Sequence, residues 1–160
     1  VPPEVIRYPT LELIHAVFVD PPSIRIAQGV GEPVLLTLEA DAPFNGGEEV
    51  EWQAIPFSAE MPEVNERQTP EVQIKIDNVA RELIPYLEGA VAMRANLTCL
   101  YREWRSDDTS APCYGPFEFT LKRVEVSRQS VTGTAKVEDL ANMKLPALVY
   151  TQNKFPGLLR

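Results

Sequence analysis

Cysteine, histidine and long apolar runs are scarce in this chain of 160 residues, and each scarcity argues against a class of protein. The cysteines are Cys99 and Cys113, which lack CxxC spacing, and His15 is the one histidine, so we expect no zinc site. No run of about 18 apolar residues is present, which argues against a membrane-spanning helix. The first residues show no charged segment followed by an apolar one, so we expect synthesis in the cytosol. In that reducing compartment, reduced core thiols are favoured over a disulfide.

Basic charge is also scarce. The chain has 15 Lys and Arg against 23 Asp and Glu, and its net charge of −8 disfavours duplex DNA, RNA and anionic membranes as direct partners. The imbalance is local, because residues 1–70 hold 3 basic against 12 acidic residues and residues 71–160 hold 12 against 11. One acidic half and one balanced half suit head-to-tail packing of copies, although an acidic face that only aids solubility is the simpler interpretation.

Proline is abundant. The chain has 15 prolines, roughly twice the usual share of about 5%, and they would interrupt long helices. Many short strands fit this composition better. The length suits a single domain, which we divide into an N-terminal arm at 1–10, a β body at 11–137 and a C-terminal arm at 138–160.

Two-residue alternation of apolar and polar side chains predicts most of the body. Strands are expected at 11–19, 24–26, 34–40, 50–57, 72–76, 91–101, 117–126 and 131–137. The alternation changes parity near Pro56 and again between Leu121 and Val124, and an inserted residue, or bulge, explains each change. Asn45-Gly46 is a strong hairpin signal between two of these strands.

A helical period follows the strand at 72–76. Asp77 or Asn78 can cap this helix, Gly89 can end it, and Pro85 is expected to kink it or to start a new turn. The fold class is therefore mainly β: an antiparallel β-sandwich or partly open barrel with one short helix at about 79–88 and extended N- and C-terminal arms.

Candidate chemistry is sparse. Any mechanism that needs histidine must use His15, which lies on an apolar strand face and is better explained as a core or interface residue. Clustered acids, as in a glycosidase pair or a calcium site, occur at Glu48, Glu49 and Glu51 and at Asp107 and Asp108. Acids in loops are usually only solvated. We therefore expect no catalytic residue, no metal and no cofactor.

Basic and aromatic side chains mix at Arg102, Trp104 and Arg105, a pattern that can serve single-stranded nucleic acid. One such cluster in an acidic protein is weak support for that role. The tail from Glu138 contains one possible helical turn, and residues 144–160 are then apolar and interrupted by prolines. An exposed surface of this kind usually contacts a partner. Packing of this tail on its own sheet is an equally good interpretation.

Four stretches together resemble an uncharacterised family of phage and prophage tail proteins. They are LELIHAVFV at 11–19, AIPFSAEMP at 54–62, VQIKIDNVARELIPYL at 72–87 and SVTGTAKVEDLANMKLPALVYTQNKFPGL at 130–158. Their order and spacing are more specific than any one stretch. The last stretch, with its VTGT turn and its Y-T-x-x-x-F-P-G-L ending, contributes most to the resemblance.

The resemblance implies a small structural protein of long-tailed phages, encoded near the tape-measure protein, a cell-wall peptidase and the tip protein. It implies a β-sandwich or barrel-like subunit in a ring at the distal tail or baseplate, and no catalytic residues. The expected partners are copies of the chain and the tube, tape-measure and tip or hub proteins. DNA is expected only as passing cargo, and no membrane binding is expected.

On the basis of this resemblance we expect a virion protein of the tail tip that is made in the host cytoplasm and joins the tail tube to the tip complex. The predicted contact residues are Val5, Ile6 and Tyr8 in the N-terminal arm, Leu148, Tyr150, Phe155 and Leu158 in the tail, and Glu60, Glu63 and Glu66 in an acidic loop. The alternatives are a sugar-binding or host-surface module that uses Trp52, Trp104, Tyr101 and Tyr114, a wall hydrolase, and a tail-assembly factor absent from the particle.

Overall fold

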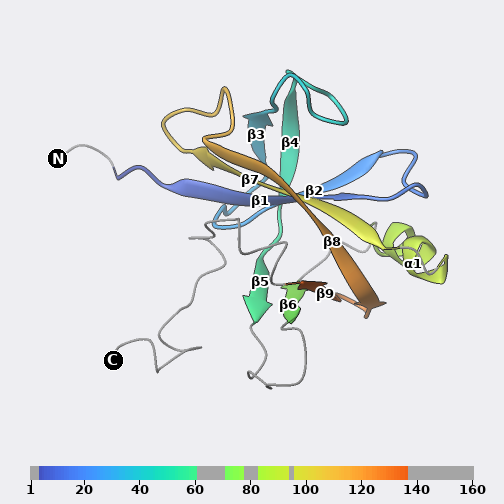
Figure 1. Cartoon of the computed structure of the whole chain (residues 1–160). Helices are drawn as coiled ribbons and strands as arrows, with labels where there is room; N and C mark the ends of the chain where they lie inside the picture. The colour runs from blue at the N-terminus through green and yellow to red at the C-terminus, as the bar shows by residue number, and fades with distance from the viewer. Residues whose placement is uncertain (1–3, 61–70, 78–82, 94–95, 137–160) are drawn as a thin grey trace, which may run out of the picture.

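A nine-stranded sheet dominates the computed structural model, which describes residues 4–60, 71–77, 83–93 and 96–136. The strand order is β3-β4-β2-β1-β7-β8-β9-β6-β5, and every neighbouring pair is antiparallel except β2 with β4. Figure 1 shows β1, β2, β7 and β8 crossing the middle, with β3 and β4 on one side and β5, β6 and β9 on the other. The mainly β fold class is confirmed, and within the described residues no strand pairing joins β3 to β5 to close the sheet into a barrel.

The described elements have these bounds: β1 Arg7–Ile14, β2 Ser23–Ala27, β3 Val34–Thr37, β4 Glu49–Ala54, β5 Phe57–Glu60, β6 Glu71–Ile76, α1 Ile84–Ala92, β7 Leu97–Arg105, β8 Tyr114–Val126 and β9 Val131–Lys136. No helix among them is long and apolar enough to cross a bilayer.

Both faces of the central strands are covered, which explains why β7 is buried almost throughout. Leu11 and Leu13 of β1 lie opposite Tyr101 and Cys99 of β7 and belong to the larger core cluster. That cluster also includes side chains of β2, β5, β6, β8, β9 and α1. On the other parity, Tyr8 lies opposite Trp104, and both belong to a second cluster with side chains of β3 and β4.

The helix begins later than the sequence predicts. It spans Ile84–Ala92, whereas the predicted range is 79–88, of which residues 79–82 lie outside the described part. Pro85 lies in its first turn, where the missing N–H has no helical partner in any case, so the prediction that Pro85 starts a new turn is confirmed. Gly89 lies inside the helix rather than ending it, because the first turn is displaced toward the C-terminus. The strand expected from residue 91 consequently begins at Leu97.

A hairpin joins β3 and β4, as Asn45-Gly46 predicts, but its loop is long. The register pairs Val34 with Trp52 and Thr37 with Glu49, and the N–H of Leu38 donates to the carbonyl oxygen of Glu48 at 3.0 Å. Residues 39–47 therefore form a broad loop, in which Asn45 and Gly47 have positive φ. This loop folds back over the sheet, so that Glu39 of the loop contacts Arg102 of β7.

One predicted bulge is confirmed and the other is wrong. Between Lys122 and Glu125 the register of β8 with β9 shifts by one residue, and Arg123 has a φ of 50°. This inserted residue accounts for the parity change between Leu121 and Val124. Near Pro56 the chain instead leaves β4 and enters β5, which lies at the far end of the strand order. The parity change there marks passage between two different strands.

The first strand also differs from its predicted range. It covers Arg7–Ile14, so residues 7–10 belong to the sheet rather than to an arm, and Val19 is 80% exposed instead of facing the core. The strand stops because the chain turns at His15, where the N–H of Phe18 donates to the His15 carbonyl oxygen. The C-terminal arm predicted at 138–160 lies outside the described residues.

Candidate functional site

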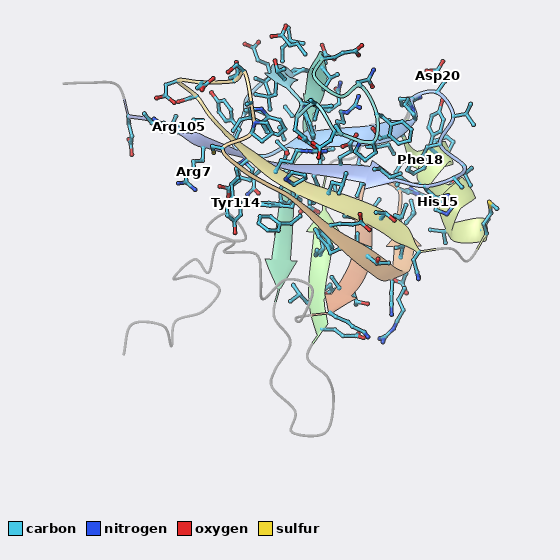
Figure 2. All side chains as sticks on the ribbon, turned by 45° about the horizontal axis from the view of Figure 1, so that its top comes forward. Arg7, His15, Phe18, Asp20, Arg105 and Tyr114 are labelled. Atoms are coloured by element: carbon cyan, nitrogen blue, oxygen red, sulfur yellow. The ribbon has the colours of Figure 1, made fainter. Side chains whose placement is uncertain are left out.

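His15 occupies a structural position. It lies just after β1, is 8% exposed, and its Nδ1 accepts a hydrogen bond from the N–H of Val17 at 3.1 Å. A neutral His15 with this bond carries its proton on Nε2. Its ring contacts that of Phe18, with centroids 5.8 Å apart. Figure 2 shows His15, Phe18 and Asp20 grouped at the end of the sheet nearest α1, away from Arg7, Arg105 and Tyr114.

The clustered acids are solvent-exposed. Glu48 accepts a hydrogen bond from Asn45, and Glu51 accepts one from Gln53. Asp107 forms an ion pair with Arg105, and this contact raises the pKa of Arg105. Hydrogen bonds from Ser110 lower the pKa of Asp108. Within the described ranges no three His, Cys, Asp or Glu residues are grouped as metal ligands.

Arg102 and Glu12 form the most strongly buried ion pair, with both side chains 0% exposed. The Nη1 of Arg102 donates to the Oε2 of Glu12 at 2.7 Å, and its Nε and Nη2 donate to the Glu39 carboxylate at 2.6–2.9 Å. The Oε1 of Glu12 accepts from the Ser23 hydroxyl at 2.7 Å and from the Nε of Arg25 at 3.2 Å. Two carboxylates thus face two guanidinium groups, which balances the buried charge.

This cluster joins three distant parts of the chain. Glu12 comes from β1, Arg102 from β7, and Glu39 from the loop between β3 and β4, while Arg25 of β2 also donates to Asn45 of that loop at 3.1 Å. The loop is therefore fastened onto the face of the central strands. The sequence pattern places Arg102 on the polar face of its strand. The sequence does hold one signal that Arg102 is buried: Leu100 and Trp104 lie at the same parity and therefore on the same face of the strand.

A second buried carboxylate, that of Glu103, lies on the opposite face of β7. It accepts hydrogen bonds from the Tyr101 hydroxyl at 2.6 Å and from the Nη1 of Arg7 at 3.1 Å. Burial, followed by the hydrogen bond to Glu103, raises the pKa of Tyr101 well above its usual range. The side chain of Arg7 is 58% exposed, so the pair extends from the core to the surface.

Three of the four aromatic residues considered for sugar stacking are inside the protein, and the fourth, Tyr114, is half-buried against the larger core cluster. Trp52, Trp104 and Tyr101 are each 0% exposed, and the two indole rings contact each other with centroids 5.3 Å apart. The Nε1 of Trp104 donates to the carbonyl oxygen of Thr37 at 2.9 Å. The Nε1 of Trp52 has no partner among the described residues. Burial of Arg102 and Trp104 also removes the basic and aromatic cluster proposed for single-stranded nucleic acid.

A cleft of about 400 Å³ lies where β2 and β4 diverge beside α1. Its lining residues are Pro21, Ser23, Ile24, Arg25, Glu51, Gln53, Leu83 and Tyr86. Ser23 and Arg25 already donate to Glu12, and Gln53 donates to Glu51. Most of the polar side chains that line this cleft therefore already have hydrogen-bond partners within the protein.

The predicted contact residues are only partly within the described structure. Val5 and Ile6 are 44% and 53% exposed, whereas Tyr8 is half-buried against the second core cluster. The backbone of Ile6 is held by Ser106, whose Oγ accepts from its N–H at 3.0 Å and whose N–H donates to its carbonyl oxygen at 2.8 Å. The remaining predicted contacts lie outside the described side chains; they are Glu60, Glu63, Glu66, Leu148, Tyr150, Phe155 and Leu158.

Comparison with known proteins places the chain in a family. No curated protein matches it. One family model, described as a domain of unknown function (DUF1833), matches residues 2–150. Because this match covers the whole β body and part of each flank, well over half of the chain, the chain belongs to the DUF1833 family.

Proposed function

We propose that the chain is a structural protein of a long-tailed phage that forms part of a ring at the distal tail or baseplate. In this role it joins the tail tube to the tip complex and contacts copies of itself, the tube, the tape-measure protein and the tip or hub protein. The proposal involves no catalysis. The four sequence stretches that resemble phage tail proteins point to this assembly.

The structural observation that carries the proposal is the exposed apolar segment before β1. Val5 and Ile6 present their side chains to solvent while two hydrogen bonds to Ser106 fix the backbone of Ile6. Figure 1 shows this segment leading away from the sheet at the N-terminal end. A pre-ordered apolar segment costs less entropy on binding than one that must be ordered, at roughly 1–2 kcal/mol per residue. Such a segment is suited to contact a different patch on a neighbouring subunit.

The buried aromatic residues weigh against the sugar-binding alternative. A stacking platform needs exposed ring faces, and Trp52, Trp104 and Tyr101 have none. A hydrolase that depends on His15 is disfavoured, because the Nδ1 of His15 already accepts a hydrogen bond from the N–H of Val17. This hydrogen bond would have to break before Nδ1 could act as a base.

Locating the chain in purified particles tests the proposal. Electron cryomicroscopy of intact virions, with mass spectrometry of the same particles, should place several copies in a ring between the tail tube and the tip. Complete absence of the chain from infectious particles would reject the proposal and favour an assembly factor. Copies placed only on peripheral fibres would favour the host-surface module.

A further inference from the structure

The two edge strands of the nine-stranded sheet, β3 and β5, differ in whether their outward-facing backbone groups are hydrogen-bonded. At the β3 end, the N–H of Leu38 donates to the carbonyl oxygen of Glu48, so these two residues form a hydrogen-bonded pair of the antiparallel ladder. Because bonded and non-bonded pairs alternate, the next pair, Thr37 with Glu49, is non-bonded, and the N–H and carbonyl of Thr37 point away from β4. Both are bonded within the chain: the N–H donates to the carbonyl oxygen of Thr109 at 3.0 Å, and the carbonyl accepts from the Nε1 of Trp104 at 2.9 Å. This end of the sheet is therefore partly closed by its own chain.

At the β5 end, the same reasoning identifies an open edge. The N–H of Asp77 donates to the carbonyl oxygen of Pro56 at 3.0 Å, and the register pairs Phe57 with Ile76. In an antiparallel ladder such bonded pairs alternate, so Phe57 and Ala59 direct their backbone N–H and carbonyl groups away from β6. Within the described residues no backbone or side-chain group bonds them. The register of β5 with β6 also contains no bulge that would twist this edge away.

We propose that the β5 edge accepts residues 147–151 from the C-terminal segment of a neighbouring copy as an added strand. This inference rests on the proposed ring, since a ring needs two different patches that meet between copies. The edge is one patch and the segment is the other. The outward groups of Phe57 and Ala59 offer two donors and two acceptors to the incoming backbone.

The sequence of the segment suits this role. Residues 147–151 read Ala-Leu-Val-Tyr-Thr, a short run rich in strand-forming residues, and Pro146 precedes it. The last described residue of β9, Lys136, pairs with Glu71 of β6, and Gln73 of β6 pairs with Glu60 of β5, so Lys136 lies two strands from the β5 edge. Ten residues separate Lys136 from Ala147 and can span at most about 33 Å, which exceeds the roughly 10 Å of two strand spacings between β9 and β5.

Disulfide trapping between two copies tests this arrangement. In full chains with Cys113→Ser, one copy carries Ser58→Cys and the other carries a single cysteine at each of positions 147–151 in turn. An added strand predicts covalent dimers at alternate positions, because successive side chains of a strand point to opposite faces. The buried Cys99 is 0% exposed and serves as the constant background thiol.

Three outcomes would overturn the inference. They are the absence of dimers, equal trapping at all five positions, and trapping only within a single chain that carries both cysteines, which would show that the segment docks on its own sheet. Detection of the chain in a particle ring without alternating trapping would reject the added strand and leave the proposed function standing.

A proline variant supplies a matched control. Ala59→Pro removes an outward N–H that β6 does not use, so the fold should persist, as monitored by circular dichroism. Trapping should fall at least about tenfold relative to Ala59→Ser, which keeps the N–H. Leu35→Pro, at the outward-facing position of the opposite edge, should leave trapping unchanged. Undiminished trapping in folded Ala59→Pro would also contradict the added strand.

Discussion

At the scale of single residues, the two buried tryptophans differ in one hydrogen bond. Trp104 and Trp52 are both 0% exposed and contact each other, but only the Nε1 of Trp104 has a described partner, the carbonyl oxygen of Thr37. An indole N–H that is bonded stabilises the fold, whereas a buried N–H without a partner costs free energy. The two residues therefore form an internal comparison.

Substitution of each tryptophan by phenylalanine should separate these effects. Trp104→Phe leaves the carbonyl of Thr37 without its donor, whereas Trp52→Phe removes an N–H that bonds none of the described residues. We expect Trp104→Phe to lower the free energy of unfolding by about 1–2 kcal/mol more than Trp52→Phe. Urea unfolding of both variants measures the difference, and equal losses would show that the Thr37 contact contributes little.

Cys99 predicts a loss of stability in alkali. Burial raises the pKa of the Cys99 thiol far above its usual range, so the folded state keeps its proton while the unfolded state does not. The contribution of this thiol to the free energy of unfolding is complete below the pKa of the unfolded state, about 8.5. Above that pH the free energy of unfolding falls by up to about 1.4 kcal/mol per pH unit, and the contribution is lost as the pH rises through the folded-state pKa.

Urea midpoints measured under reducing conditions from pH 7 to 9.5 check this prediction. Cys99→Ala should show a shallower decline with pH than the wild type, because the titrating thiol is gone. The exposed Cys113 supplies the control, and Cys113→Ala should keep the wild-type slope. If Cys99→Ala also keeps that slope, another group controls the alkaline transition.

At the scale of elements, a bulge in β8 requires a glycine. Between the pairs Tyr101–Phe117 and Glu103–Tyr114, β8 has one more residue than β7, and Gly115 there has a φ of 86°. A Cβ on Gly115 would collide with the backbone carbonyl oxygen of Tyr101. Only glycine meets both demands, the left-handed backbone and the close approach of the neighbouring strand.

Gly29 has the left-handed backbone of Gly115 but not its close neighbour, so the two effects can be measured separately. It has a φ of 77°, but a Cβ built on it has nothing within 4 Å. Gly29→Ala should therefore lose about 1 kcal/mol from backbone strain alone, whereas Gly115→Ala should lose at least about 2 kcal/mol more because a strand must shift. Thermal or urea unfolding of both variants provides the measurement. Similar losses would mean that β8 moves away at little cost.

The loop between β3 and β4 is held to the sheet by Arg102, which bonds Glu39 of the loop. Arg102→Met would leave the fully buried carboxylate of Glu12 without its closest guanidinium and would release Glu39 of the loop. We expect a loss of about 3–5 kcal/mol in the free energy of unfolding, because a buried charge is left unpaired. Arg105→Met breaks only an exposed pair with Asp107 and should show no measurable change. A small effect at Arg102 would imply that water or Arg25 replaces it.

At the scale of the whole molecule, the proposed ring depends on exposed apolar contacts. Val5 and Ile6 are exposed and their side chains contribute little to the core, so Val5→Asp with Ile6→Asp should fold normally. The double variant should fail to incorporate into tails, because charged carboxylates would be buried at the interface. Complementation of a phage lacking the gene measures this effect.

Val19 is the matched control for this prediction. It is 80% exposed but lies at the other end of β1, so Val19→Asp adds a charge without touching the N-terminal segment. We expect it to support tail assembly. Normal incorporation of the Val5 and Ile6 double variant would show that this segment is not a subunit contact.

What the sequence alone determined is local. Alternation places Leu11 and Leu13 on one face, and the parity change between Leu121 and Val124 identifies the bulge, because each follows from neighbours along the chain. The sequence also indicates the helix but not its bounds, since Pro85 permits either a kink or a start.

The tertiary structure decided the rest. Glu12 meets Arg102 across 90 residues of chain, and only strand pairing and the fold-back of the 39–47 loop turn a polar strand face into a buried one. For the same reason, no local pattern shows that Thr37 is closed off by Trp104 and Thr109 while the edge of β5 stays open among the described residues. Burial and edge exposure depend on which distant segments come together, and local periodicity carries no such information.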